Sequence, residues 1–236
     1  MRKALLLARH DIIGQYSDRA AIVRALLLTA LPIVIVLLNR SAASARGSSD
    51  VLILVFGLYS ALLPAATAIN AAAGSFAGEK EAQTLVPLLA APIRDVDIVA
   101  GKLMATVVPS AALSLASVLS FYVAATFVFG ADRVARLVPP TTLFAFWVLA
   151  VFFVLTLGSW VMVLSSRVST QRNAQQVAGF VTAGMFIGLS ALGSLLAQNI
   201  SSDLVLVALA AVLFSDLVAL ELARRLWHRE EAVARL

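Results

Sequence analysis

Residues 79–102 read EKEAQTLVPLLAAPIRDVDIVAGK, the longest stretch of this chain that combines dense charge with an amphipathic pattern. Apolar stretches lie on both sides of it, and each is long enough to cross a membrane, which takes roughly 20 residues. A polar, helix-prone insert between two membrane spans is where a soluble partner would bind a membrane protein. The stretch therefore indicates an all-α integral membrane protein with a contact element between its second and third spans.

The composition supports membrane insertion and excludes several kinds of chemistry. Hydrophobic residues make up 61% of the 236 residues and the mean hydropathy is +0.96, well above the level of a soluble domain. The chain contains no cysteine, which excludes disulfides, thiolate nucleophiles and cysteine-ligated metals. The net charge of +5 comes from basic residues near span ends, where membrane topology places them, so we expect no nucleic-acid partner.

Six apolar stretches predict six transmembrane helices in one transmembrane domain that covers residues 1–236. The expected spans are residues 21–38, 51–76, 103–129, 141–164, 177–196 and 204–223. Residues 77–102 form a polar loop with a short helix of its own, and residues 224–236 form a charged tail. The sequence shows no internal repeat and no soluble domain.

The first 19 residues predict an amphipathic helix that lies at the membrane interface. Their apolar run stops at Arg9 after five residues, too short for the core of a signal peptide. Leu5, Ile12 and Tyr16 recur at helical spacing and form the expected apolar face. The polar side of this helix is expected to carry Lys3, His10, Asp11 and Asp18.

The distribution of Lys and Arg predicts the orientation in the membrane. With the N-terminus inside, 14 of the 18 basic residues lie near cytoplasmic span ends, and four lie outside: Arg40, Arg46, Arg133 and Arg136. Because basic residues concentrate on the cytoplasmic side, both termini and the loop at residues 77–102 are predicted to be cytoplasmic.

The loop contains an apolar stripe that needs a partner. Thr84 is positioned to cap a short helix in which Leu85, Leu88 and Leu89 share one face. An apolar stripe on a helix outside the bilayer must be buried against another surface. The membrane surface and a groove on a partner protein are the two candidates.

Nucleotide chemistry is not expected on this chain. Gly101 and Lys102 are similar to the end of a phosphate-binding loop, but that motif needs a glycine five residues before Gly101 and a Ser or Thr after the lysine. Those two positions are Val96 and Leu103. The sequence therefore predicts that this chain has no nucleotide site, no resident cofactor and no metal site.

Polar residues inside the spans give candidates for a translocation path. Thr67, Asn70 and Gly74 recur on one side of the second span and are candidates to line a conduit. Ser and Thr in spans more often bond neighbouring helices, so that interpretation stays open for Thr67. Asp216 is the carboxylate deepest within a predicted span, and we interpret it as a structural, hydrogen-bonded group because no second intramembrane charge could complete a relay.

The fifth predicted span carries glycines at close-packing spacing. Gly184 and Gly188 form a small-xxx-small pattern, which Gly179 extends towards the start of the span. Small residues at this spacing let helix backbones approach closely in membranes. The contact is predicted either within the chain or across a two-fold dimer.

The chain resembles the permeases of ABC-2-type exporters. Their loop between the second and third spans is matched by Glu79, Glu81, Thr84, Leu85, Leu88, Leu89, Pro92, Gly101 and Lys102, and SSRVSTQRNAQQ at residues 165–176 is similar to the segment before their fifth span. The resemblance implies that the loop holds a coupling helix that docks on an ABC ATP-binding subunit, present in two copies and binding ATP and Mg²⁺. It also implies a second permease copy, with the fifth span near the dimer axis. The chain departs from larger members in its short link at residues 197–203 and in Pro87 within the expected coupling helix.

Three alternatives to an exporter permease in the cell membrane remain at this point. A closely related one is a membrane subunit that passes ATP-driven motion to an extracytoplasmic partner without moving a substrate. A stand-alone secondary transporter would need several intramembrane ionisable residues, and Asp216 alone meets that requirement. A membrane enzyme would need a catalytic constellation, but His10 and His228, the two histidines, both lie near the termini.

Overall fold

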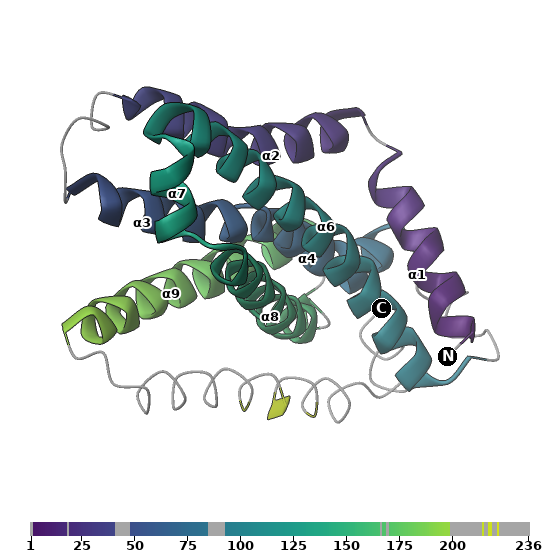
Figure 1. Cartoon of the computed structure of the whole chain (residues 1–236). Helices are drawn as coiled ribbons and strands as arrows, with labels where there is room; N and C mark the ends of the chain where they lie inside the picture. The colour runs from purple at the N-terminus through teal and green to yellow at the C-terminus, as the bar shows by residue number, and fades with distance from the viewer. Residues whose placement is uncertain are drawn as a thin grey trace. The chain divides into compact units, whose positions relative to one another are not determined.

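The computed structural model of the chain describes residues 2–17, 19–40, 48–84, 93–165, 167–168 and 170–198, together with positions 214, 217, 218 and 221. Every regular element that can be bounded within these ranges is an α-helix (Figure 1). These helices are α1 (Arg2–Gln15), α2 (Arg19–Leu38), α3 (Ser48–Leu62), α4 (Ala65–Glu81), α6 (Asp95–Phe129), α7 (Ala131–Leu137), α8 (Pro140–Ser165) and α9 (Gln171–Gln198).

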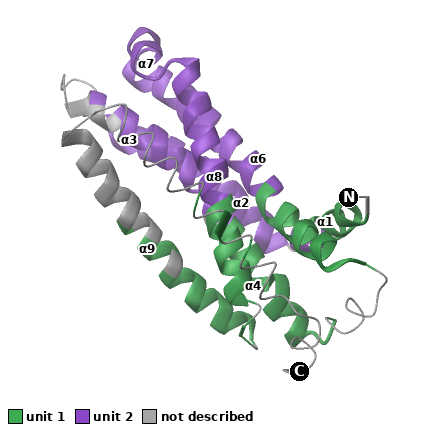
Figure 2. Ribbon diagram, turned by 90° about the horizontal axis from the view of Figure 1, so that it is seen from below, with its two compact units in different colours: residues 1–12, 68–107, 155–236 green, residues 13–67, 108–154 purple. Residues whose placement is uncertain are grey.

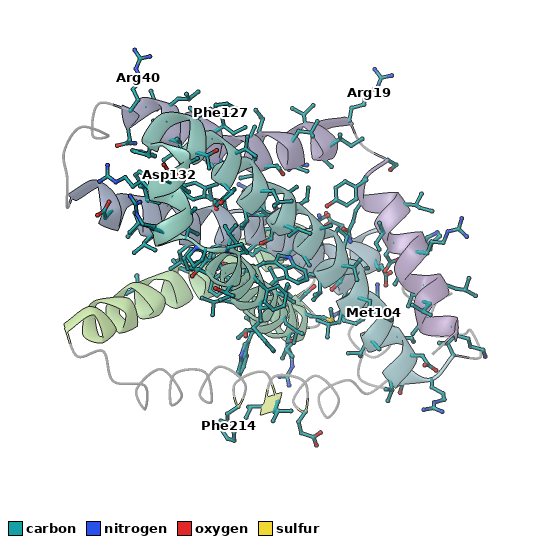
Figure 3. The ribbon with its side chains drawn as sticks, in the orientation of Figure 1. Arg19, Arg40, Met104, Phe127, Asp132 and Phe214 are labelled. Carbon is teal, nitrogen blue, oxygen red and sulfur yellow. The ribbon has the colours of Figure 1, made fainter. Side chains whose placement is uncertain are left out.

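Four described stretches are long and apolar enough to cross a membrane, and they correspond to the first four predicted spans. They are Arg19–Leu38, Ile53–Glu81, Asp95–Phe129 and Pro140–Ser165. Figure 3 shows Arg19 and Arg40 at the two ends of α2, as expected for an apolar helix flanked by cations that reach the headgroups. The fifth predicted span lies within α9, whereas most of the sixth, residues 204–223, falls outside the described residues together with Asp216 and the tail.

Two helices extend beyond the predicted spans into the charged stretch. The sequence predicts that the second span ends at residue 76 and the third begins at residue 103, but α4 continues to Glu81 and α6 begins at Asp95. Hydropathy marks the part of a helix that suits hydrocarbon, while the helix itself continues through polar residues. The 35 residues of α6 measure about 52 Å, against a hydrocarbon thickness of ~30 Å. The connection between α4 and α6 is therefore residues 82–94, and the predicted coupling helix around Leu85 to Leu89 lies outside the described residues.

The chain divides into two compact units, which Figure 2 distinguishes by colour. One unit comprises residues 13–67 and 108–154, and its apolar core is built mainly from Val36, Ile53, Phe121, Ala125, Val134 and Val138. Its helices also bond to one another through side chains. Ser114 Oγ donates to Ala61 O at 2.6 Å, and Trp147 Nε1 donates to Ala111 O at 3.0 Å. Arg133 pairs with Asp50 at 2.7 Å.

A proline separates α3 from α4 inside the second span. Pro64 has no N–H and disturbs the helix, so α3 ends at Leu62 and α4 begins at Ala65. Thr67 adds polar contacts at this break, because its hydroxyl donates to Pro64 O at 2.6 Å and lies 3.1 Å from Ser110 Oγ. A break of this kind is tolerated in a membrane span when side chains re-satisfy the backbone.

The other unit comprises residues 1–12, 68–107 and 155–236. One of its apolar clusters contains Ala72, Ala73, Ala77, Val161, Ala174 and Ala178, and another contains Phe76, Ile98 and Met162. Ser165 fixes α8 against α4, because its hydroxyl donates to Ala73 O at 2.7 Å and accepts from Ala77 N at 3.1 Å. Small side chains thus bring these helices close together, and a polar contact sets their register.

Candidate functional site

A lysine side chain is buried where α1, α4 and α6 meet. Lys102 lies two turns after the start of α6, and its side chain is only 1% exposed. A lysine is almost never buried to this extent without partners for its charge. The groups around its ammonium must therefore compensate the charge.

The Lys102 ammonium binds three groups on the last turns of α4 and faces one carboxylate of α1. Its Nζ lies 2.6 Å from Glu79 Oε1 and donates to Ser75 O at 2.7 Å. The nitrogen is 5.1 Å from the centre of the Phe76 ring, within the range of a cation–π contact. Asp11 Oδ2 lies 3.7 Å away, at ion-pair distance. We call these five residues, Asp11, Ser75, Phe76, Glu79 and Lys102, the Lys102 junction.

The charges of the Lys102 junction depend on one another. Two carboxylates, Asp11 and Glu79, share one ammonium, and Glu79 Oε2 is buried without a hydrogen-bond partner among the described residues. Breaking a buried ion pair by removing one partner typically costs about 3–5 kcal/mol, because the other charge stays buried. Loss of Lys102 would therefore leave an acidic pair in a poorly solvated place, and the three helix segments would separate or rearrange.

A glycine lets α1 approach α6 next to this ammonium. A methyl group added at Gly101 would lie 2.9 Å from Ala4 O and 3.0–3.1 Å from the Leu7 side chain. Ala4 and Ala8 are buried on the same face of α1, which continues to Asp11. Figure 1 shows α1 beside the first turns of α6.

This contact face differs from the predicted apolar face of the N-terminal helix. Of the predicted apolar face, Leu5 is 59% exposed and Ile12 and Tyr16 are half-buried, whereas the side chain of Asp11, which the sequence assigned to the polar side, is only 19% exposed. The reason is that the contact face of α1 is formed by the small residues Ala4 and Ala8 and by Asp11, whose carboxylate pairs with Lys102. Leu7 also packs at this contact, whereas Leu5, Leu6 and Ile13 remain on the outside of α1, where a membrane interface would accommodate them.

The last turn of α4 ends in a Schellman motif that starts at Glu79. Thr84 N donates to Glu79 O at 2.9 Å, and Gln83 N donates to Lys80 O at 3.1 Å. Gln83 has φ of 59°, the left-handed conformation that this motif requires and that glycine usually supplies. Thr84 N–H thus closes α4, and the helix that Thr84 is predicted to begin lies outside the described residues. Glu79 consequently binds Lys102 through its side chain and determines through its backbone where the connection begins.

The end of α4 also contacts the beginning of α9. Glu81 Oε2 accepts a hydrogen bond from Gln171 N at 3.0 Å, a favourable place for a negative charge at a helix N-terminus. The Gln171 side chain lies against Gly74 and Gly78, where an added methyl group would approach it to 3.3–3.5 Å. Lys80 Nζ reaches Val168 O at 3.5 Å. The two glutamates thus act on different neighbours, Glu79 on α6 and Glu81 on α9.

The other residues singled out from the sequence have the following surroundings. Thr67 bonds at the proline break, Asn70 is exposed, and Gly74 lies against Gln171, so the three are not gathered in one described cluster. Leu85, Leu88 and Leu89 fall outside the described residues.

Two glycines of α9 face open space within the described chain. At Gly179 and Gly184 an added methyl group would meet no atom within 4 Å, and the neighbouring Phe180 is 80% exposed. Gly188 belongs to the same helix, α9, and its surroundings lie outside the described part of the chain.

The sequence assigned no site role to Asp11, Gly101 or Lys102. Gly101 and Lys102 match the end of a phosphate-binding loop, but the other positions of that motif do not fit this sequence. A signal was present in the sequence, because a lysine at the end of an apolar span needs a carboxylate, and Glu79 is the nearest acidic residue of the preceding helix that faces it. Asp11 carries no comparable signal, since it is 91 residues away.

Comparison with known families gives a match over most of the chain. The family described as ABC-2 family transporter protein matches residues 36–211. This range includes Glu79, Lys102 and the connection between α4 and α6, but it begins after α1, so Asp11 lies before the matched region. Comparison with curated proteins gives no match.

We expect Gly101→Ala to lower the apparent melting temperature of the purified protein by a few degrees. Alanine favours a helix over glycine by up to ~1 kcal/mol, but here its methyl group would meet the Ala4 carbonyl at 2.9 Å, and a backbone atom cannot move aside cheaply. Gly14→Ala in α1 is the matched control, because a methyl group there meets no atom within 4 Å. Equal melting temperatures for the two variants would contradict the close α1–α6 contact.

Proposed function

The chain belongs to the ABC-2 family of transporter membrane proteins, and we propose that it is the membrane-spanning permease subunit of an ATP-driven ABC exporter. The family match across residues 36–211 is the observation that carries this proposal, and the four candidate spans agree with it. Proteins of this family have no nucleotide site of their own. ATP and Mg²⁺ are therefore bound by a separate ABC ATP-binding subunit.

In this proposal the ATPase docks on the connection between α4 and α6. The apolar stripe of Leu85, Leu88 and Leu89 supplies the contact surface. Glu79, Glu81 and Thr84 set the start of the connection, because they bind Lys102, Gln171 N and the last turn of α4. What supports this site is that both ends of the connection are held together by the Lys102–Glu79 pair, so a force on it reaches α4 and α6 at once.

The working assembly in this proposal has two permease copies and two ATPase subunits. Each permease crosses the cell membrane six times with both termini in the cytoplasm, an orientation supported by the 14 to 4 distribution of basic residues. The exposed glycine face of α9 is the proposed contact between permeases, and the polar side of the second span is the proposed conduit. The residues concerned are Gly179, Gly184 and Gly188 for the contact and Thr67, Asn70 and Gly74 for the conduit.

Replacing Leu85 and Leu88 with Asp should abolish ATPase binding while leaving the permease inserted in the membrane. Burying each leucine in a partner groove is worth about 1.5–3 kcal/mol, so losing two should weaken binding by at least roughly a hundredfold. Co-purification of the tagged permease with the ATPase subunit measures this. The matched control is the pair of substitutions Leu85→Met and Leu88→Met, which keeps the stripe apolar and should retain binding. Normal ATPase affinity in the Asp variant would rule out docking on this stripe.

Cysteine introduced at Gly184 should form a disulfide between two permease copies in membranes. The native chain has no cysteine, so every cross-link comes from the introduced residue. Cysteine at Phe127, which is 85% exposed on α6, serves as the control for random collision in the bilayer (Figure 3). If position 184 gives no more dimer than position 127 on a non-reducing gel, α9 does not form the permease contact.

A further inference from the structure

The Lys102–Glu79 pair closes the base of the connection between α4 and α6. Glu79 is in the last turn of α4, and Lys102 lies seven residues after Asp95, about 10 Å along α6. Their 2.6 Å contact therefore links the two helices close to the point where the chain enters residues 82–94. The Schellman motif at Thr84 extends this fixed geometry into the connection itself.

The same ammonium also holds a helix that is remote in the sequence. Asp11 of α1 lies 3.7 Å from Lys102 Nζ, and α1 packs on the adjacent Gly101. On its other side α1 exposes Leu5, Leu6 and Ile13. Only residues 16–18 separate α1 from α2, the first candidate span, so a displacement of α1 must pull on the start of that span.

We propose that Lys102 is a positioning residue that makes α1 move with the α4–α6 connection, through simultaneous bonds to Glu79 at the base of the connection and to Asp11 on α1. This inference rests on the proposed function, in which an ATPase displaces the connection. It adds a second route for that displacement: besides α4 and α6, the motion reaches α1 and, through the chain itself, the first span.

The composition of the Lys102 junction favours a positioning role over a contribution to stability alone. Apolar residues of similar volume would stabilise a buried contact as well as an ion pair does, because burying the charges cancels much of their attraction. The attraction in an ion pair depends on the distance between the charges, so the Lys102 ammonium must stay within reach of both carboxylates. Glu79 uses one carboxylate oxygen for Lys102, and among the described residues the other has no hydrogen-bond partner. Among the described residues, the Glu79 carboxylate therefore has its hydrogen bond from Lys102.

Site-specific fluorescence tests the inference on the permease co-purified with its ATPase subunit. A single cysteine at Gln83, at the start of the connection, or at Leu5, on the exposed side of α1, carries an environment-sensitive dye. The signal is compared between Mg²⁺–ATP and ADP. In the otherwise native protein we expect a nucleotide-dependent change at both positions.

Asp11→Asn is the decisive variant, because it removes the charge of the α1 link and leaves the Glu79–Lys102 pair in place. We expect the change at position 5 to fall by roughly fivefold, the effect of losing a partly exposed ion pair, while the change at position 83 persists. Asp11→Glu should restore the signal at position 5, whereas a purely structural role would not distinguish Asn from Glu by charge. Asp132→Asn, an exposed carboxylate in α7, is the matched control.

Each other outcome has a defined meaning. An unchanged signal at position 5 in both Asp11→Asn and Lys102→Met overturns the inference and leaves the proposed function standing. A nucleotide-dependent change at position 83 without one at position 5 in the native protein also overturns the inference and leaves the proposed function standing. Absence of a nucleotide-dependent signal at position 83 contradicts the proposed function, and the inference falls with it.

Discussion

A buried ammonium must have its charge compensated, and the structure around Lys102 follows from this requirement. The end of α4 has to present the Glu79 carboxylate and the Ser75 carbonyl towards α6, and α1 has to present Asp11. Gly101 must lack a side chain, or α1 could not come close enough. Three segments separated by up to 91 residues in the sequence are thereby held at one nitrogen atom. Both helices that flank the connection between α4 and α6 are held at this nitrogen, within about two turns of their ends.

Both units of the chain combine polar side-chain contacts between helices with an ion pair. In the unit with α2, α3 and α7, hydroxyl and indole groups bond to backbone carbonyls, as Ser114 and Trp147 do. Such contacts suit hydrocarbon surroundings, because they satisfy polar groups without introducing charge. The unit with α1 has a hydroxyl contact of the same kind at Ser165, and its ion pair, unlike Arg133–Asp50 of the other unit, has a buried cation, Lys102. The charge of the Lys102 junction is consistent with a position near the edge of the membrane. In the proposed function, this is where a mechanical signal from a soluble ATPase would enter.

The helical architecture and the first four spans could be predicted from apolar stretches and proline positions, because hydrocarbon imposes a simple length requirement. The helix ends could not, since α4 and α6 continue through charged residues that lower hydropathy without breaking a helix. The role of Asp11 was missed because a helical wheel separates polar from apolar residues and cannot show that a carboxylate faces a buried lysine. Ala4 and Ala8, which form the real contact face of α1, carry too weak a hydrophobic signal to reveal it.

Hydrogen–deuterium exchange of the α1 amides in Lys102→Met tests most directly whether Lys102 holds α1 in place. The account predicts that residues 4–11 exchange at least roughly tenfold faster than in the native protein, because local opening of α1 then leaves no bond to the ammonium to break. Amides of α7, in the other unit, report that the variant is folded and should keep their native rates. Native exchange rates in α1, with α7 equally protected, would show that α1 is held without Lys102 and would contradict the account.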